Sequence, residues 1–354
     1  VQGDWAQFSL PPVTPWMAKS SLAQPPPKDS LFDSVHRLRA RLSAPAFNTT
    51  AVAAVRGFAL RYGRAKASSL DTLGSLQEPF FTPEEYAAFK NAEGSPRPAT
   101  RALPARQAAL VTDYDPALQE EGIGLGIAAG VAAQGLDNDR ALLRYLNMLG
   151  TLLAESSGAY AYPFKIYATK AKEVNALSVP GGYIFLSRRL ISACQNEAEL
   201  AAVIAHEMTH ITRKHGLKEI KVRDPNIRAD QAMAELDAEA GAGPDPEAEA
   251  ELNDFSDTAY EAVHKPRLQS YEEEADQGAL VILAKAGYEP AAVPRMIERV
   301  GAAVVKDQTL ETENPFAKMD YKKRREQAAS FLRKELASAS GVSNAPRFQK
   351  SVAP

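Results

Sequence analysis

The sequence predicts a mainly helical α+β fold with a small β-sheet, preceded by an N-terminal accessory region. Two segments, 196–215 and 270–278, carry helix-start signals, and the first also has apolar residues at helical spacing. A third segment, 183–186, alternates its side chains like a short strand and follows a Pro-Gly-Gly turn. At 38.2 kDa and 45% hydrophobic residues, the chain is long enough for a sizeable core and for two domains.

Charge and hydropathy argue against nucleic-acid binding and against a membrane span. The formal net charge is −3, whereas nucleic-acid binders usually display a basic face. The most apolar run, 122–136, is shorter than the roughly 20 residues that a spanning helix needs, so we expect it to begin a packed helix. Cys194 is the only cysteine, which excludes a disulfide within the chain and a thiolate metal cluster. We expect it to be a small buried residue.

The segment His206-Glu207-Met208-Thr209-His210 has the pattern His-Glu-x-x-His. On a helix, His206 and His210 leave the same face one turn apart, so both rings can bind one metal ion, with Glu207 beside them. Because the chain has only 5 histidines, a chance match is expected roughly once in 200 such chains. We interpret the segment as a zinc-hydrolase motif; the alternative is a solvated helix face with accidental spacing.

The flanking residues place this motif on a rigid helix. Asn196 can cap its N-terminus, and Glu199 completes a capping box three residues later. We expect the helix to run to about His215 and to stop at Gly216, with His215 packing or hydrogen-bonding near the helix end rather than binding the metal. An apolar stripe that would hold the helix against a core consists of Leu200, Val203, Ile204 and Ile211.

A third metal ligand is expected from a second helix. Ser270 and Glu273 have the spacing of a capping box at its start. Glu272 and Asp276 then share a face, which suits Glu272 as the third ligand and Asp276 as the acceptor that orients one of the histidines. Glu272 lies 62 residues after His210 (272 − 210), so tertiary folding must bring the two helices together. The alternative role for Glu272 is ordinary capping at an acidic helix start.

With these motifs, the chain resembles the M48 family of zinc metallopeptidases, in its soluble bacterial envelope type. The resemblance also rests on 175–187, which looks like the family's strand segment with Asn-Ala and Pro-Gly-Gly, and on 286–290 and 121–154. It spans 105–336. A metzincin would instead need a third histidine at position 216, where this chain has Gly216.

The resemblance implies a predominantly helical, zincin-type peptidase domain with its small sheet beside the active-site cleft. It implies one Zn²⁺ per chain, held by His206, His210 and Glu272, with Glu207 as general base on a zinc-bound water that attacks a peptide bond. It also implies an exposed edge strand that binds extended or unfolded protein segments by backbone pairing. The candidate substrate-binding residues are Asn175, Ala176, Pro180, Gly181 and Gly182.

The chain departs from the family at a His-Pro element that follows the third ligand in many relatives. Its counterpart here is Asn314-Pro315, and asparagine can donate a hydrogen bond but cannot become a cation. The candidate transition-state donors are Asn314, His264 and Arg325, together with Arg267 and Tyr260. The departure keeps an alternative function open, that of a zinc-stabilised envelope chaperone or assembly factor that binds clients with little or no proteolysis.

Composition and resemblance divide the chain into a Pro-rich, partly helical accessory region (1–104), a peptidase domain (105–336) and a C-terminal tail (337–354). The accessory region is expected to contain helices at 31–42 and 83–91, and its role is not assigned.

Two charged segments of the peptidase domain are expected to be solvated. Residues 229–254 are rich in Asp and Glu and lack Lys and Arg, which predicts a mobile acidic insertion. A predicted helix at 321–336 carries four consecutive basic residues, 322–325, which a solvated face explains.

The expected partners are protein or peptide substrates. The chain begins with Val1 rather than Met, which is compatible with removal of a signal peptide or a lipid-anchored segment. Together with the resemblance, this predicts the bacterial periplasm or cell envelope, with the cytoplasm as the alternative.

Overall fold

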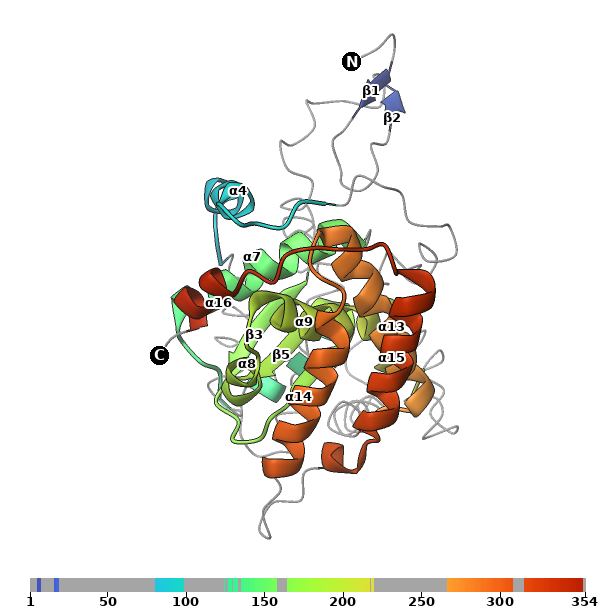
Figure 1. The fold of residues 1–354 in the computed structure, drawn as a ribbon. Helices are drawn as coiled ribbons and strands as arrows, with labels where there is room; N and C mark the ends of the chain where they lie inside the picture. Colours follow the sequence, from blue (N-terminus) through green and yellow to red (C-terminus); the bar gives the residue numbers. More distant parts are fainter. Residues whose placement is uncertain are drawn as a thin grey trace, which may run out of the picture.

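The described part of the chain is mostly helical and contains one three-stranded sheet (Figure 1). The computed structural model describes residues 5–7, 16–18, 80–98, 124–157 and 164–219 with short gaps, 266–307 and 315–352. The predicted helix at 31–42 and the acidic insertion at 229–254 lie outside these residues. Two short strands near the N-terminus, β1 (Trp5–Gln7) and β2 (Trp16–Ala18), pair antiparallel.

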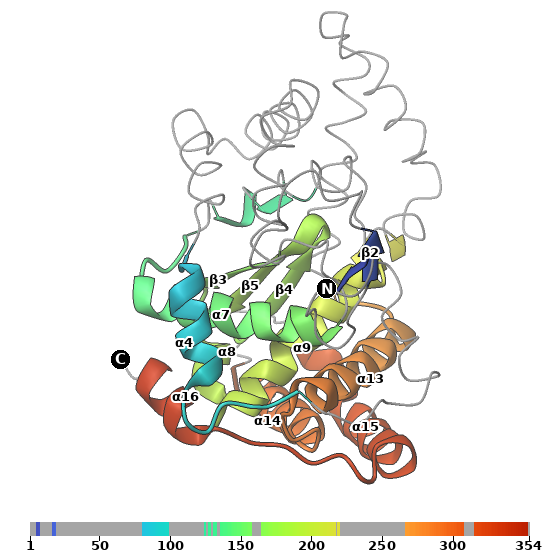
Figure 2. The same cartoon turned by 90° about the horizontal axis from the view of Figure 1, so that it is seen from above.

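The three-stranded sheet has the order β3-β5-β4, with β3 at Lys165–Thr169, β4 at Ala176–Val179 and β5 at Tyr183–Ser187 (Figure 2). β3 runs parallel to β5, while β4 runs antiparallel to it. The short helix η2 (Pro180–Gly182) joins β4 to β5, and its two glycines have φ angles of 80° and 106° that favour glycine. Among the described strands, β4 therefore lies at an edge, as predicted for the segment from Asn175.

Helix α7 (Arg140–Ser157) packs against the sheet and is fixed to it by a buried asparagine. The amide of Asn147 donates to the carbonyl of Ile166 at 2.7 Å, and its oxygen accepts from the Ile166 N–H at 2.9 Å. The Asn147 side chain thus hydrogen-bonds both the N–H and the C=O of Ile166. These groups point away from β5, on the side of β3 where the described residues contain no further strand. In the apolar run before α7, Ile127 and Val131 are helical and buried, as predicted. No helix of the described residues is long and apolar enough to cross a bilayer.

Helix α9 (Glu197–Thr212) carries the His-Glu-x-x-His motif through the core. Asn196 caps it as predicted, accepting from the Glu199 N–H at 3.0 Å. The carboxylate of Glu199 accepts from the Gln195 N–H instead of that of Asn196, so only half of the predicted capping box forms. The helix ends at Thr212, three residues before His215. All 16 of its residues are buried, so it is a core helix rather than a surface helix with one apolar stripe.

Three further helices, α13 (Gln269–Ala286), α14 (Ala292–Asp307) and α15 (Tyr321–Glu335), pack beyond α9. α13 packs along α9, and α14 lies between α9 and α15 (Figure 1). The predicted capping box at Ser270 and Glu273 is wrong, because α13 begins two residues earlier, at Gln269, with Leu268 as its cap residue. The buried Glu219 carboxylate accepts from the Leu268 N–H at 2.6 Å and holds this helix start instead.

A buried glutamate at the start of α9 fastens the C-terminal helix α16 (Ala345–Val352) to the core. The carboxylate of Glu197 accepts from Tyr145, Tyr288 and Asn344, and from two nitrogens of Arg347, one of them at 2.6 Å. Arg347 also donates to the Phe89 carbonyl at 2.9 Å, which ties in α4 (Pro83–Asn91), a helix found at its predicted bounds. One ion pair thus connects three helices.

Replacing Arg347 with Ala is expected to destabilise the fold by about 3–5 kcal/mol, because the fully buried Glu197 carboxylate loses its cation. The matched control is Arg325→Ala, which removes an ion pair to Glu298 whose side chains are 39% and 62% exposed. We expect that control to cost about 1 kcal/mol or less. Urea unfolding measures both, and equal losses would contradict a special role for the buried pair.

Candidate active site

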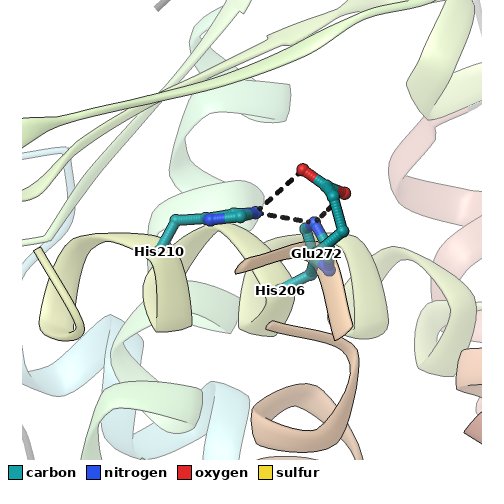
Figure 3. Close-up of side chains that lie close together, drawn as sticks. All are labelled: His206, His210 and Glu272. Carbon is teal, nitrogen blue, oxygen red and sulfur yellow. Dashed lines mark hydrogen bonds and ion pairs between the residues drawn. The ribbon is translucent and has the colours of Figure 1, made fainter. Parts of the chain in front are cut away.

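Three buried side chains from two helices converge on one point (Figure 3). The Nε2 atoms of His206 and His210 are 3.0 Å apart, and the carboxylate of Glu272 lies 3.4 Å and 3.5 Å from them. Two ligands on a tetrahedral zinc ion, each at roughly 2.0–2.1 Å, are roughly 3.3 Å apart. The spacing of these three groups therefore fits a single zinc-sized ion, and the structure brings together the residues that the sequence predicted as ligands.

The close approach of α13 to α9 depends on a glycine. A Cβ atom placed on Gly278 would lie 2.3 Å from Thr209 Oγ1 and 2.4 Å from Thr209 Cγ2. No side chain other than hydrogen fits between the helices at this level. Gly278 lies on the same helix as Glu272 and Asp276, so this contact sets how closely both carboxylates approach His206.

Asp276 lies behind the cluster, as predicted. Its Oδ1 is 2.9 Å from Nδ1 of His206, on the opposite side of the ring from Nε2. This contact fixes the orientation of the imidazole and leaves Nε2 directed at His210 and Glu272.

Arg324 balances the negative charge of the cluster. It donates to both oxygens of Asp276 at 2.9 Å and 2.7 Å and lies 2.9 Å from Glu272 Oε2. Burial acts to raise the pKa of both carboxyl groups, but Arg324 and His206 outweigh it and hold both pKa values below their usual range. The prediction of a solvated basic face is wrong for Arg324, which is buried. The sequence does carry a sign of this burial, because Arg324 has helical spacing with the apolar residues Tyr321 and Ala328 and therefore lies on their side of α15.

His215 holds the second histidine from behind. Its Nδ1 lies 2.9 Å from Nδ1 of His210, and its Nε2 lies 3.3 Å from the carboxylate of Glu274. The ring stacks on Tyr271, with centroids 4.3 Å apart. Burial, supported by nearby Arg267, lowers the pKa of His215 to about 3, so it is neutral. This agrees with the prediction that His215 forms hydrogen bonds near the helix end rather than joining the cluster.

Glu207 faces the same space and is connected to the sheet. Burial raises its pKa, although His206, a hydrogen bond from Ser178 and the charge of Arg267 oppose the rise. Arg267 in turn donates to Ser178 Oγ at 3.1 Å and to the Ser178 carbonyl at 3.0 Å. Ser178 was missed from the sequence, because nothing in its immediate neighbours marks a serine on β4 as a partner of α9.

A cavity of about 80 Å³ opens at the cluster, between β4, α9, α14 and the short helix η3 (Pro315–Lys318). Of the predicted substrate-binding residues, Asn175 and Ala176 line it, whereas Pro180 lines a smaller hollow beside His210. Gly181 and Gly182 are buried in the turn and line neither cavity.

The structure describes two of the predicted transition-state donors and brings one of them to the site. Arg267 lines the cavity, but Arg325 is paired with Glu298 on the exposed side of α15 and is not brought to the site. Asn314, His264 and Tyr260 lie outside the described residues.

Residues 141–338 match the profile of Peptidase family M48. The match covers more than half of the chain, so the chain belongs to this family and is a metallopeptidase.

Similar proteins occur in bacteria and in a yeast. The beta-barrel assembly-enhancing protease of Escherichia coli O157:H7 is 29% identical over 174 residues, or 47% of this chain and 34% of that protein. The protease of the same name from Yersinia pestis is 36% identical over 84 residues, or 24% of this chain and 17% of that protein. The Mitochondrial metalloendopeptidase OMA1 of Schizosaccharomyces pombe is 27% identical over 148 residues, or 42% and 40%. The chain spans about a third of the length of the bacterial relative from Escherichia coli.

Gly278→Ala is expected to destabilise the protein by about 1–3 kcal/mol, because the new methyl group meets Thr209. The sign of this change in the free energy of unfolding is informative, because replacing glycine with alanine at an unhindered helix position stabilises a protein by about 1 kcal/mol. Thermal or urea unfolding of the metal-free protein measures the change. Thr209→Ala in the same chain should recover part of the loss, and additive effects of the two changes would contradict a direct clash.

Proposed function

We propose that this chain is a zinc endopeptidase that hydrolyses peptide bonds in extended or unfolded protein segments. In this proposal His206, His210 and Glu272 hold one zinc ion, and Glu207 is the general base. The observation that carries the proposal is the convergence of two imidazole nitrogens and one carboxylate at 3.0–3.5 Å beside a buried glutamate. Two neutral imidazoles and a carboxylate with an adjacent water position are a ligand set of catalytic zinc sites.

The side chains of this cluster have separable roles. A bound zinc ion supplies Lewis-acid polarisation of the scissile carbonyl and lowers the pKa of water to about 7. Glu207 accepts the proton of the attacking water and returns it to the leaving amine, and its raised pKa makes it a stronger base. Asp276 and His215 hold the two imidazole rings from behind. Arg324 offsets the charge of Glu272 and Asp276, so two carboxylates can stay ionised in the core.

The edge strand β4 supports binding of an extended substrate. The Ser178 carbonyl accepts from Arg267, so its backbone groups face away from β5. Ala176, two residues earlier, faces the same way because backbone direction repeats every second residue in a strand. Its free backbone groups lie beside the cavity, where an extended peptide can add to the sheet. Arg267 is well placed to donate to the substrate carbonyl, a role that the sequence left open between several residues.

The proposed localisation and substrates of this chain rest on the names of its relatives. Because the bacterial relatives are named beta-barrel assembly-enhancing proteases, we place this chain in a bacterial periplasm or at the cell envelope. Its substrates there would be unfolded or misassembled protein chains.

Glu207→Gln is expected to lower the rate of peptide-bond cleavage by about 10²- to 10⁴-fold, because the amide cannot accept the proton. Reduced casein is the substrate, cleavage is followed by gel and mass spectrometry, and zinc content is measured in the same samples. The control is Glu298→Gln, which changes an exposed glutamate on α14 and should leave the rate unchanged. Equal cleavage by Glu207→Gln and the unchanged chain would remove Glu207 from the mechanism. Client binding without cleavage by either protein would favour the chaperone function instead.

Zinc binding at neutral pH is expected to release a proton from His206. Burial acts to lower the pKa of His206, but Asp276 and Glu272 outweigh it and raise this pKa to about 9 in the metal-free protein. Because zinc binds the unprotonated nitrogen, its affinity should rise with pH up to about 9 and then level off. Calorimetry in buffers of different ionisation enthalpy counts the released protons. A zinc affinity that does not change between pH 7 and pH 9 would contradict the assignment of His206.

A further inference from the structure

His210 has a second ring nitrogen, which points away from the metal cluster. Its Nε2 faces His206 and Glu272 (Figure 3), while its Nδ1 lies 2.9 Å from Nδ1 of His215. A neutral imidazole carries one proton, so Nε2 of His210 is free to bind a metal only when that proton is on Nδ1. The Nδ1–H of His210 then donates to His215, which has to accept it on its own Nδ1.

The same reasoning places the proton of His215. Because Nδ1 of His215 accepts, its single proton is on Nε2, which lies 3.3 Å from the Glu274 carboxylate. An ionised carboxylate accepts hydrogen bonds and donates none, so the chain of donors ends at Glu274. The hydrogen bonds therefore run in one direction, from His210 through His215 to Glu274.

The backbone before His215 is turned in a way that makes this contact possible. α9 ends at Thr212. In a continuing helix, a residue five positions after His210 would lie roughly 140° around the axis and could not meet its ring. Instead, Lys214 has a φ angle of 56°, in the left-handed region, and the chain turns so that the His215 ring lies against His210. A non-glycine residue in this region is uncommon and is kept where the surrounding contacts require it.

Helix α13 supplies both contacts that hold the His215 ring. Tyr271 stacks on it with the ring planes 6° apart, and Glu274 accepts from its Nε2. The same helix carries Asp276, whose carboxylate faces Nδ1 of His206 directly. Both histidines of the motif are thus held by a carboxylate of α13, one directly and the other through an intervening imidazole.

We propose that Glu274 is a positioning residue of the metal site, and that it acts through His215 to keep His210 in the tautomer that binds zinc through Nε2. This inference rests on the proposed zinc site and adds two supporting residues to it. Glu274 does not line the cavity at the cluster. Its influence should therefore appear in zinc binding rather than in the binding of substrate.

Nitrogen NMR of the zinc-loaded, full-length chain, labelled at histidine, tests the direction of the hydrogen bonds without any substitution. The chemical shifts of the two ring nitrogens show which of them carries the proton. The chain has 5 histidines, and the signals that disappear in His215→Phe identify that residue. We expect the proton of His210 on Nδ1 and that of His215 on Nε2. A His215 proton on Nδ1 would overturn the proposal.

Two substitutions at position 215 separate the hydrogen bond from the packing. His215→Phe keeps a ring that can stack on Tyr271 but has no acceptor, whereas His215→Asn keeps an acceptor oxygen and loses the stacked ring. We expect zinc affinity, measured by competition with a chelator, to fall by about 10- to 100-fold in His215→Phe and by less than about 10-fold in His215→Asn. Thermal unfolding of the metal-free proteins checks that both variants fold. A greater loss of zinc affinity in His215→Asn than in His215→Phe would assign His215 to packing alone.

Glu274→Ala removes the end of the hydrogen-bond chain. Because the Glu274 side chain is 47% exposed, water partly replaces it, and we expect zinc affinity to fall by about 3- to 10-fold. The matched control is Glu273→Ala, which removes the neighbouring carboxylate, a partner of Gln269 and Lys323, and should leave zinc affinity unchanged. Combining Glu274→Ala with His215→Phe should cost no more than His215→Phe alone, since Glu274 acts through that ring. Additive losses, or equal effects of the two glutamate variants, would contradict the proposal.

Zinc binding by the unchanged chain separates this inference from the function on which it rests. If the unchanged chain binds no zinc, or if His210→Ala binds it equally tightly, the proposed zinc site fails. If zinc binding depends on His210 but the substitutions at positions 215 and 274 leave the affinity unchanged, the zinc site stands and the hydrogen-bond chain has no positioning role.

Discussion

The contact between Gly278 and Thr209 is the constraint on which the metal cluster depends. His206 and His210 come from one helix, and helical spacing alone brings their rings together. Glu272 comes from another helix, and its carboxylate reaches both rings only because α13 lies unusually close to α9 at Gly278. The close contact between α9 and α13 therefore belongs both to the packed core and to the metal cluster, so a change in side-chain volume there affects stability and the cluster together.

The second constraint is electrostatic. Two carboxylates and three imidazoles lie in a part of the core from which water is largely excluded, an arrangement that needs compensation. Arg324 supplies the positive charge, and the stacked, neutral His215 takes the remaining nitrogen of His210 without adding charge. β4 adds a third support through Ser178, which connects Glu207 to Arg267. Each group of the cluster is thus held from behind by a residue of a different segment.

The sequence predicted what is encoded locally and missed what depends on tertiary contacts. Helix spacing around His206 and His210, the cap at Asn196 and the Pro-Gly-Gly turn are local patterns, and the structure confirms them. Glu272 was predicted from the face that it shares with Asp276 on a second helical segment, but only the fold shows how a residue 62 positions after His210 reaches the two rings. The role of Arg324 was missed because four basic residues in a row indicate a solvated face, and only the fold shows which of them turns inward. The start of α13 was misplaced because its backbone is satisfied by Glu219 from a distant segment.

The ion pair at the beginning of α9 has a consequence for the order in which the molecule is built. Glu197 lies at the entry to the helix that carries both histidines, and its guanidinium partner follows 150 positions later in the chain. During synthesis the ribosome must release the whole stretch from Glu197 to Arg347 before that carboxylate can be neutralised. A contact between such distant positions closes a large loop and forms late in folding. The entry of the helix that carries both histidines is therefore expected to become fixed only after translation has passed Arg347.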